Sequence, residues 1–396
     1  MSIKRARGKV IAVVIGFVSA GLLASCAPPL PPDAQAVAAE RILNCVPGEQ
    51  QITTPDYLAA PLDFVNSTLL GQCPEQSMAF VTDGDLPVQI LDRAPTDAEI
   101  AEFERFCGTE VVVAPIFGYA SNIAYNRPGL DDVFFTPDVA ADILTGKITR
   151  WNDPRIVELN EGYEFDSTPI TLLRLNKPTG AVEAFTKWLS EAAPENWTLG
   201  QIDVLPNGKE VDGMQSLLDE LSLEYGALTV VPTYEAQIFA MQLASLPAGE
   251  SQINAVDSDF PKIGMAAAEI NFDDKGHMRT THATGGVPIE GQFDAAAAKI
   301  VIQPDQEIVG WPSNAVAHVM ACDKADDPLP KATAQYLVRL SAQGSIEGAG
   351  LTGLPEPIRF RTFPALKVKL PEDLTAVDLE IEEEVVENET GLERQQ

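Results

Sequence analysis

The sequence has few basic residues and very few histidines. Lysine and arginine together number 27 against 58 aspartates and glutamates, a formal net charge of −31, and there are three histidines. Phosphate backbones and anionic membrane surfaces are bound by clustered lysine and arginine, so this balance argues against nucleic acid as a partner and against adsorption to such a surface. Hydrophobic residues still make up 45% of the 396 residues, which excludes disorder for most of the chain.

The motifs of common enzyme and metal-binding classes are also missing. The sequence has no Gly-x-Ser-x-Gly elbow, no Walker loop and no dinucleotide-type glycine fingerprint after a strand. No CxxC pair or Cys/His cluster has the spacing of a metal site. We interpret His277 and His282 as loop residues and His318 as a core residue of an apolar strand. We therefore expect no enzyme activity, no cofactor and no metal.

The first 25 residues have the pattern of a lipoprotein signal peptide. Four basic residues between Lys4 and Lys9 precede the apolar stretch Val10 to Leu23, which is short for a transmembrane span. Small residues then lead into Cys26, as in a bacterial lipobox; an ordinary secretory signal and an uncleaved anchor are the alternatives. We predict that Cys26 is lipidated and holds the protein on the extracytoplasmic face of the cell membrane. The proline-rich residues 26–35 form a stiff linker.

Four further cysteines follow, Cys45, Cys73, Cys107 and Cys322. An even number in an exported protein suggests two disulfides, and three pairings are possible. We favour Cys45 with Cys73 and Cys107 with Cys322; buried free thiols are the alternative.

The last 26 residues differ in composition from the rest of the chain. Residues 371–396 hold ten acidic residues against one basic residue, Arg394, and no aromatic. We predict an acidic disordered tail, with a partner-binding segment as the alternative.

The body of the chain alternates strand-like and helix-like segments, which indicates an α/β architecture. A helix is predicted from Thr96, because Glu99 three residues later completes a capping box. The stretch Glu110 to Tyr125, rich in valine, isoleucine and tyrosine, predicts a long strand. Further predicted elements are a helix over Ala181–Ala192, a strand over Ala315–Cys322 and a helix over Lys331–Ala342.

Residues 111–162 carry a resemblance to a known family. They contain a turn from Tyr125 to Gly129 that reads YNRPG, a helix with Ala-Asp-Ile, the segment GKITRWNDP from Gly146 to Pro154, and then Leu-Asn. Several rare residue types in this order closely resemble the phosphate-binding protein family, the substrate receptors of phosphate ABC transporters. A weaker resemblance covers roughly residues 80–365.

The resemblance implies a two-lobed, periplasmic-binding-protein-like α/β fold of type II, with two chain crossings between the lobes. Carried over to this chain, the crossings lie near residues 115–119 and 310–313. Trp151 is then expected in the core and Asp153 as a helix cap. The implied organisation is a signal peptide (1–25), a linker (26–35), the first part of lobe 1 (36–117), lobe 2 (118–309), the returning part of lobe 1 (310–370) and the tail (371–396).

The family binds its anion with an arginine followed closely by Asp-Gly-Ser-Gly-Thr at a helix start. In the matching stretch, Thr179 and Gly180 fall on the family's serine and glycine, and Ala181 falls on its first threonine. The resemblance therefore implies ligand binding by Thr179, Gly180 and Ala181, with Arg174 and Arg93 as charge partners. The plain alternatives are an N-cap role for Thr179 and a surface ion pair of Arg93 with a neighbouring aspartate.

The chain also departs from the family pattern. No Gly-Ser-Ser or Gly-Ala-Gly-Ala-Thr loop follows the linker, and Asp92 or Arg93 stands where the family has Ser-Asp or Ser-Arg. Arg174 is one residue further from the turn than usual, and the turn lacks one hydroxyl and the aspartate.

We therefore expect a membrane-anchored extracytoplasmic receptor that binds inorganic phosphate or a similar oxyanion and passes it to an ABC permease. The alternative is a degenerate family member without phosphate binding, which acts as a structural or interaction lipoprotein of the cell envelope. Removing the signal peptide leaves 23 basic against 58 acidic residues, a charge of −35. This charge slows anion encounter at low salt but does not exclude binding by backbone N–H groups.

Overall fold

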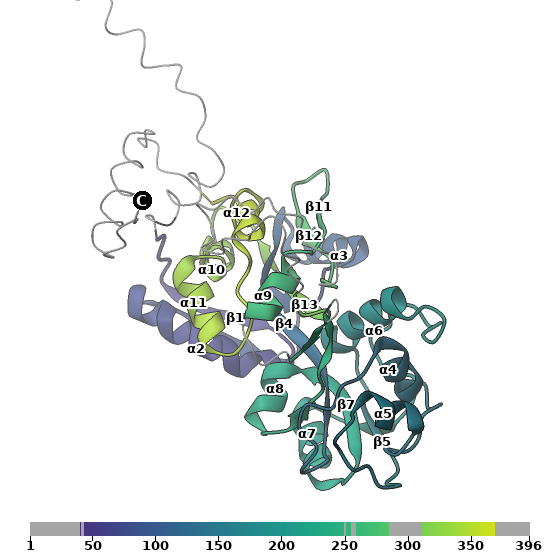
Figure 1. The fold of residues 1–396 in the computed structure, drawn as a ribbon. Coiled ribbons are helices and arrows are strands. Elements are labelled where there is room, and N and C mark those ends of the chain that lie inside the picture. Colours follow the sequence, from purple (N-terminus) through teal and green to yellow (C-terminus); the bar gives the residue numbers. More distant parts are fainter. Residues whose placement is uncertain (1–39, 41–42, 249–250, 255–258, 285–309, 369–396) are drawn as a thin grey trace, which may run out of the picture.

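The chain forms two α/β lobes, one above the other in Figure 1, as the sequence resemblance implied. The computed structural model describes residues 40, 43–248, 251–254, 259–284 and 310–368. The predicted lipidation site at Cys26, the signal peptide and the acidic tail lie outside these residues. The domain boundaries given above stay predictions.

One long strand, β4 (Val111–Tyr125), belongs to both lobes. Its first part, up to Ala120, pairs antiparallel with β13 (Asn314–Cys322), and its last five residues pair antiparallel with β7 (Ala227–Pro232). All 15 residues of β4 are buried, as its apolar sequence predicts. The predicted strand at Glu110–Tyr125 is thereby confirmed.

Pro115 lies in the middle of β4, where it has no N–H to donate to the sheet. The register with β13 shifts between Ala317 and His318, opposite this proline. The bulge is how the sheet accommodates a proline in a central strand.

The sheet runs in the order β2-β1-β3-β13-β4-β7-β5-β6, and β8 pairs with the end of β4. In lobe 1, β1 pairs parallel with both β2 and β3, and β3 pairs antiparallel with β13. In lobe 2, β5 pairs parallel with β7 and β6. The remaining strands of this sheet are β1 (Gly48–Thr53), β2 (Gln76–Val81), β3 (Val88–Leu91), β5 (Thr171–Leu175), β6 (Lys209–Val211) and β8 (Gln242–Leu243).

Helices cover both lobes, and two short hairpins complete the described chain (Figure 1). Lobe 1 carries α2 (Asp56–Gln72), α3 (Asp97–Cys107), α10 (Leu329–Leu337), α11 (Leu340–Gly348) and α12 (Glu356–Ala365). Lobe 2 carries α4 (Pro137–Leu144), α5 (Pro154–Leu159), α6 (Gly180–Ala192), α7 (Met214–Leu223) and α8 (Thr233–Ile238). The other elements are α9 (Asp259–Met265) and the hairpins β9 (Leu246–Ala248) with β10 (Ser251–Ile253) and β11 (Ile270–Phe272) with β12 (Met278–Thr280).

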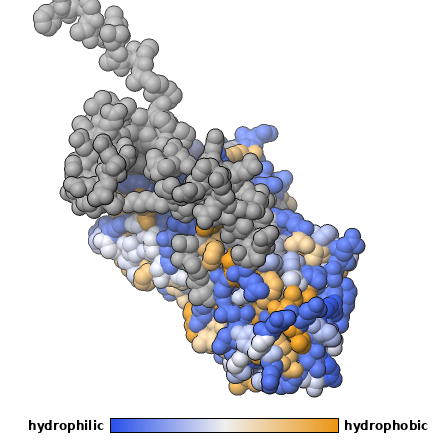
Figure 2. All heavy atoms as spheres, in the orientation of Figure 1, coloured by the Kyte–Doolittle hydropathy of each residue, from blue (hydrophilic) through white to orange (hydrophobic). Residues whose placement is uncertain are grey.

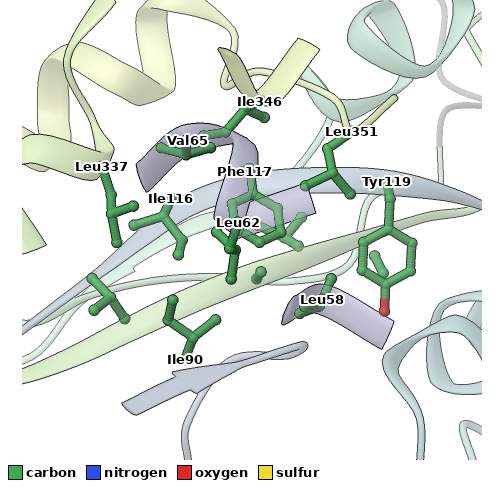
Figure 3. Packing of buried hydrophobic residues seen from close by; sticks show 14 of the residues in the cluster. Leu58, Leu62, Val65, Ile90, Ile116, Phe117, Tyr119, Leu337, Ile346 and Leu351 are labelled. Carbon is green, nitrogen blue, oxygen red and sulfur yellow. The ribbon is translucent and has the colours of Figure 1, made fainter. Parts of the chain in front are cut away.

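The core of lobe 1 lies between the sheet and helices α2, α10 and α11. Figure 3 shows Leu58, Leu62 and Val65 of α2 beside Ile116 and Phe117 of β4, with Tyr119 at one end of the group. Each of these side chains is at most 1% exposed. Burying such a side chain fully stabilises the fold by about 1.5–3 kcal/mol, so this group anchors α2 to the sheet.

The core of lobe 2 is built around tryptophan. Trp151 is fully buried and its indole N–H donates to the carbonyl of Gly226 at 3.0 Å. Asp153 caps α5 through a hydrogen bond from the N–H of Arg155 at 3.1 Å. The segment GKITRWNDP is therefore scaffold in this structure, as expected.

Several local predictions are confirmed. Thr96 and Glu99 form the capping box at the start of α3. The structure forms both favoured disulfides, Cys45–Cys73 and Cys107–Cys322, each with a Cα–Cα distance of 5.5 Å.

The helix predicted over Lys331–Ala342 is wrong in one respect, because two helices occupy this region. The backbone of Arg339 is extended and separates α10 from α11. The side chain of Gln343 donates to the carbonyls of Leu337 and Ile116, so the carbonyl freed at the end of α10 has a partner.

The described surface is rich in polar residues. On the face shown in Figure 2, hydrophilic residues cover much of the coloured surface, with smaller apolar areas between them. None of the described helices is long and apolar enough to cross a bilayer.

Candidate functional site

A cleft of about 530 Å³ lies where the two lobes meet. Lobe 1 contributes the segment Thr53 to Tyr57 and residues near the end of β3, and lobe 2 contributes the segment Leu175 to Thr179 and the start of α7. The N-termini of α2, α6 and α7 all reach this cleft. Helix N-termini present free N–H groups and the positive end of the helix dipole, so their convergence favours an anion.

The N-terminus of α6 is built from three of the predicted site residues. Thr179 is the N-cap, and its hydroxyl accepts the N–H of Val182 at 3.3 Å. The N–H of Gly180 points out of the helix toward lobe 1, and the carbonyl of Ala181 accepts the hydroxyl of Ser121 at 2.7 Å. Thr179 therefore serves as a cap, while the Gly180 N–H is available to an anion from outside the helix.

A carboxylate from lobe 1 already occupies that position. Oδ2 of Asp92, just after β3, accepts the Gly180 N–H at 2.5 Å and also accepts the hydroxyl of Tyr57. A Cβ atom on residue 180 would lie 2.2 Å from the carbonyl oxygen of Asp92 and 2.9 Å from the hydroxyl of Tyr119. Glycine is required at this position because the two lobes approach each other too closely for a side chain.

Arg93 lies beside the same helix but is paired with a carboxylate of its own lobe. Its guanidinium donates to both oxygens of Glu99, at 2.9 and 2.6 Å. The hydrogen bonds from Arg93 lower the pKa of Glu99 to about 2. The pKa of Arg93 is raised, first by its hydrogen bond to Glu99 and further by the charges of Glu99, Glu183 and Asp92.

Arg174 is also paired, and it is not among the residues that line the cleft. It is on β5, its side chain is 20% exposed, and it forms an ion pair with Glu210 on the neighbouring strand β6. The structure thus brings Thr179, Gly180 and Ala181 together with Arg93 nearby, and it places Arg174 on the sheet. Ligand contacts by these five residues stay predictions.

Sequence reasoning missed the contribution of the first lobe. No glycine-rich loop was found there, but Thr53 to Tyr57 lead from β1 into α2 and line the cleft. Asp56 accepts the N–H of Tyr57 at 3.0 Å, and the hydroxyl oxygen of Thr54 is buried without a partner. A threonine and a proline directly before an acidic residue are a helix-start signal that points to this segment.

The cleft is acidic on the lobe 1 side. Asp56 and Asp83 line it. Burial, reinforced by the charge of Asp56, raises the pKa of Glu235 on α8 to about 7. Lys177 of lobe 2 is an exposed cation at the rim. The described residues therefore offer this cleft mainly backbone N–H groups and little positive charge from arginine.

The three histidines are buried structural residues. His318 is fully buried in β13, and its Nε2 accepts the N–H of Thr280 at 2.9 Å. His277 contacts Asp273 through Nδ1 at 2.7 Å, and Nδ1 of His282 accepts the N–H of Val316 at 3.1 Å. Within the part of the chain that the structure describes, no group of three histidine, cysteine or acidic side chains is arranged to hold a metal ion.

Comparison with known proteins places this architecture in a family. The model of the PBP superfamily domain matches residues 75–337, about two thirds of the chain. The chain is 28% identical over 139 residues to phosphate-binding protein PstS 3 of Mycobacterium leprae, which covers 32% of this chain and 38% of that protein. It is 27% identical over 267 residues to phosphate-binding protein PstS of Xylella fastidiosa, with coverage of 63% and 67%. The match to the Mycobacterium leprae protein thus spans less than half of that relative's length.

Solved structures share the fold. A human phosphate binding apolipoprotein superposes with a TM-score of 0.55 at 13% identity, covering 80% of this chain and 94% of that chain. A high affinity periplasmic phosphate-binding protein with bound phosphate gives a TM-score of 0.53 at 12% identity, with coverage of 80% and 92%. At such identity the likeness extends to the two-lobed fold alone.

Proposed function

Because the chain belongs to the PBP superfamily, we propose that it is an extracytoplasmic substrate receptor that binds phosphate or a related small oxyanion between its two lobes. It delivers this ligand to an ABC permease, and a lipid on Cys26 holds it on the membrane. The closed form with the ligand bound between the lobes is the form that the permease accepts. The relatives are named as phosphate-binding proteins, which supports phosphate as the ligand.

One observation carries this proposal: the N-terminus of α6 binds a carboxylate. The Gly180 N–H donates to Oδ2 of Asp92, which supports a role for this N–H as a donor to an anion. A phosphate oxygen has the same acceptor chemistry and more charge. In the proposed complex the ligand takes the Gly180 N–H, and the hydroxyls of Thr179 and Tyr57 lie within reach of its other oxygens.

The arginines contribute only if they change partners. Arg93 is bound to Glu99 and Arg174 to Glu210 in this structure. Arg93 lies on the α6 side of lobe 1, so a rotation of its side chain away from Glu99 brings it to the ligand. Arg174 is bound to Glu210 on the edge strand β6, and we expect it to contribute less than Arg93.

Calorimetric titration of the full chain in detergent micelles with phosphate, and with sulfate as the control anion, tests the proposal. We expect saturable, phosphate-selective binding that Thr179→Ala weakens about tenfold, the effect of losing one hydrogen bond and the cap. Thr145→Ala is the matched control, because Thr145 ends α4 away from the cleft and bonds only within its own helix.

Failure of both anions to bind to protein with a native circular dichroism spectrum would overturn phosphate transport. The interaction lipoprotein would then be the better description. Equal affinity for phosphate and sulfate would retain an oxyanion receptor and remove phosphate as its specific ligand.

A further inference from the structure

The carboxylate of Asp92 forms one of the hydrogen-bonded contacts between the two lobes. Asp92 is on lobe 1, and its Oδ2 accepts one hydrogen bond from Tyr57 of lobe 1 and one from Gly180 of lobe 2. The carboxylate thus makes to α6 the contact that a bound oxyanion makes in the proposed function. The Asp92 carboxylate therefore complements the positive end of the α6 dipole from within the protein.

The backbones at this contact are as close as a glycine allows. The carbonyl oxygen of Asp92 lies 2.2 Å from the position of a Cβ on residue 180. The first turn of α6 carries a second contact, between Oε2 of Glu183 and Nε2 of His282 at 3.4 Å. Nδ1 of His282 accepts the N–H of Val316, which holds the ring beside Glu183. The start of α6 is therefore held by the Asp92 hydrogen bond and packs against His282.

Three buried tyrosines pack beside Asp92, each from a different part of the fold. Tyr57 is on α2, Tyr119 on β4 where the chain crosses between the lobes, and Tyr234 on α8, which follows β7 of lobe 2. Tyr57 and Tyr234 both pack edge-on against Tyr119, with ring centroids 6.4 and 6.0 Å away, and none of the three is more than 7% exposed.

The hydroxyl of Tyr234 also donates to the carbonyl of Tyr57 at 2.8 Å. This bond runs from the helix after β7 to the first turn of α2. Opening of the lobes would expose the rings to water, so the cluster favours the closed arrangement whether or not a ligand is present.

We infer that Asp92 is a latch that holds the lobes closed in the absence of ligand, by taking the hydrogen bond that an oxyanion would otherwise take. An incoming ligand has to displace the Asp92 carboxylate from Gly180 before it can bind there. The ligand-free protein is therefore mostly closed, and ligand enters through a minor open population. This inference takes the ligand-binding position at the N-terminus of α6 from the proposed function. Closure of the lobes itself is measurable without any ligand.

Interlobe distances in the full chain test the latch. Spin labels on non-canonical amino acids at the exposed positions Glu102 of lobe 1 and Glu158 of lobe 2 leave the cysteines untouched. Without ligand, the wild-type chain is expected to show mainly short distances, and Asp92→Ala is expected to shift most of the distribution to longer ones. Asp83→Ala is the matched control, since Asp83 lines the same cleft and its carboxylate contacts Thr82 of its own lobe.

A second variant guards against misfolding of Asp92→Ala. Gly180→Ala keeps the carboxylate but places a methyl group against the Asp92 carbonyl, so it is also expected to open the lobes. The latch is refuted if the ligand-free wild-type chain is open, or if folded Asp92→Ala and Gly180→Ala both keep the wild-type distribution.

Addition of phosphate separates this inference from the proposed function. A wild-type chain that is open alone and closes with phosphate refutes the latch and supports the receptor. A chain that is closed alone, opens in Asp92→Ala, and shows neither a distance change nor calorimetric heat with phosphate supports the latch and overturns the receptor.

Discussion

The indole N–H of Trp311 donates to the carbonyl of Ser121 at 3.0 Å, and the two residues are 190 positions apart in sequence. Ser121 begins the part of β4 that pairs with lobe 2, and its own N–H donates to the carbonyl of Ser313 at 2.9 Å. Trp311 is fully buried. The returning chain is thus bonded to β4 at the point where β4 changes lobe.

Replacement of Trp311 by phenylalanine is expected to destabilise the fold by about 2–4 kcal/mol. The substitution leaves the Ser121 carbonyl without its donor and opens a cavity beside the crossing. Urea unfolding followed by circular dichroism measures the loss. Trp197→Phe is the control, because its indole bonds only to Gly200 within lobe 2. Separate unfolding transitions of the two lobes are expected for Trp311→Phe alone, and a single shared transition in both variants would contradict this role.

The pH dependence of stability should contain a contribution from His318. Burial lowers the pKa of His318 to about 3, below its ordinary value near 6.5. Because the unfolded chain binds this proton more readily, the contribution is fully favourable above pH 6.5 and is lost as pH falls. The loss between pH 7 and pH 5 is about 2 kcal/mol. Urea unfolding should show that His318→Asn is less stable than wild type at pH 7 but loses less unfolding free energy between pH 7 and pH 5. A loss equal to that of wild type would exclude His318 as the source of the acid destabilisation.

Glu235 should make a contribution to the pH dependence of stability that is opposite in sign to that of His318. Its folded pKa of about 7 lies above the ordinary value, so the protonated form is favoured by folding. The contribution of Glu235 to stability is greatest below about pH 4.5 and falls as the pH rises toward 7. Glu235→Gln should therefore stabilise the protein at pH 8 relative to pH 5, by roughly 1–2 kcal/mol after solvent screening. Thermal unfolding at both pH values measures this, with the exposed Glu102→Gln as control, and an equal effect at the two pH values would contradict the prediction.

The two disulfides should differ in what they contribute. Cys107–Cys322 joins residues 215 positions apart, and Cys45–Cys73 joins residues 28 apart. From loop entropy alone, removal costs about 5 kcal/mol for the long loop and about 4 kcal/mol for the short one. Paired cysteine-to-alanine variants compared by urea unfolding test the order. Greater destabilisation on removal of Cys45–Cys73 would show that native packing, rather than chain entropy, decides their effect.

Features that depend on neighbours in sequence were predictable. The Thr96–Glu99 capping box joins two residues that are three positions apart. The continuous apolar run of β4 marks a strand buried on both faces. Trp151 and Asp153 have the roles that the resemblance implied. The break at Arg339 was not predictable, because it depends on Gln343 reaching the carbonyl of Ile116, which is 227 residues away.

The sequence by itself determined the elements, the two-lobed α/β class through its family resemblance, and the α6 turn at Thr179 as the candidate anion seat. Only the tertiary structure decided which group bonds to the N-terminus of α6. Gly180 meets Asp92 across 88 residues, and Asp92 meets Tyr57 across 35. The partner of Arg174 was likewise set by folding, since Glu210 is 36 residues away. Hydrogen bonds and ion pairs between distant residues are chosen by the packing of helices and strands against each other, and that packing leaves no local pattern in the sequence.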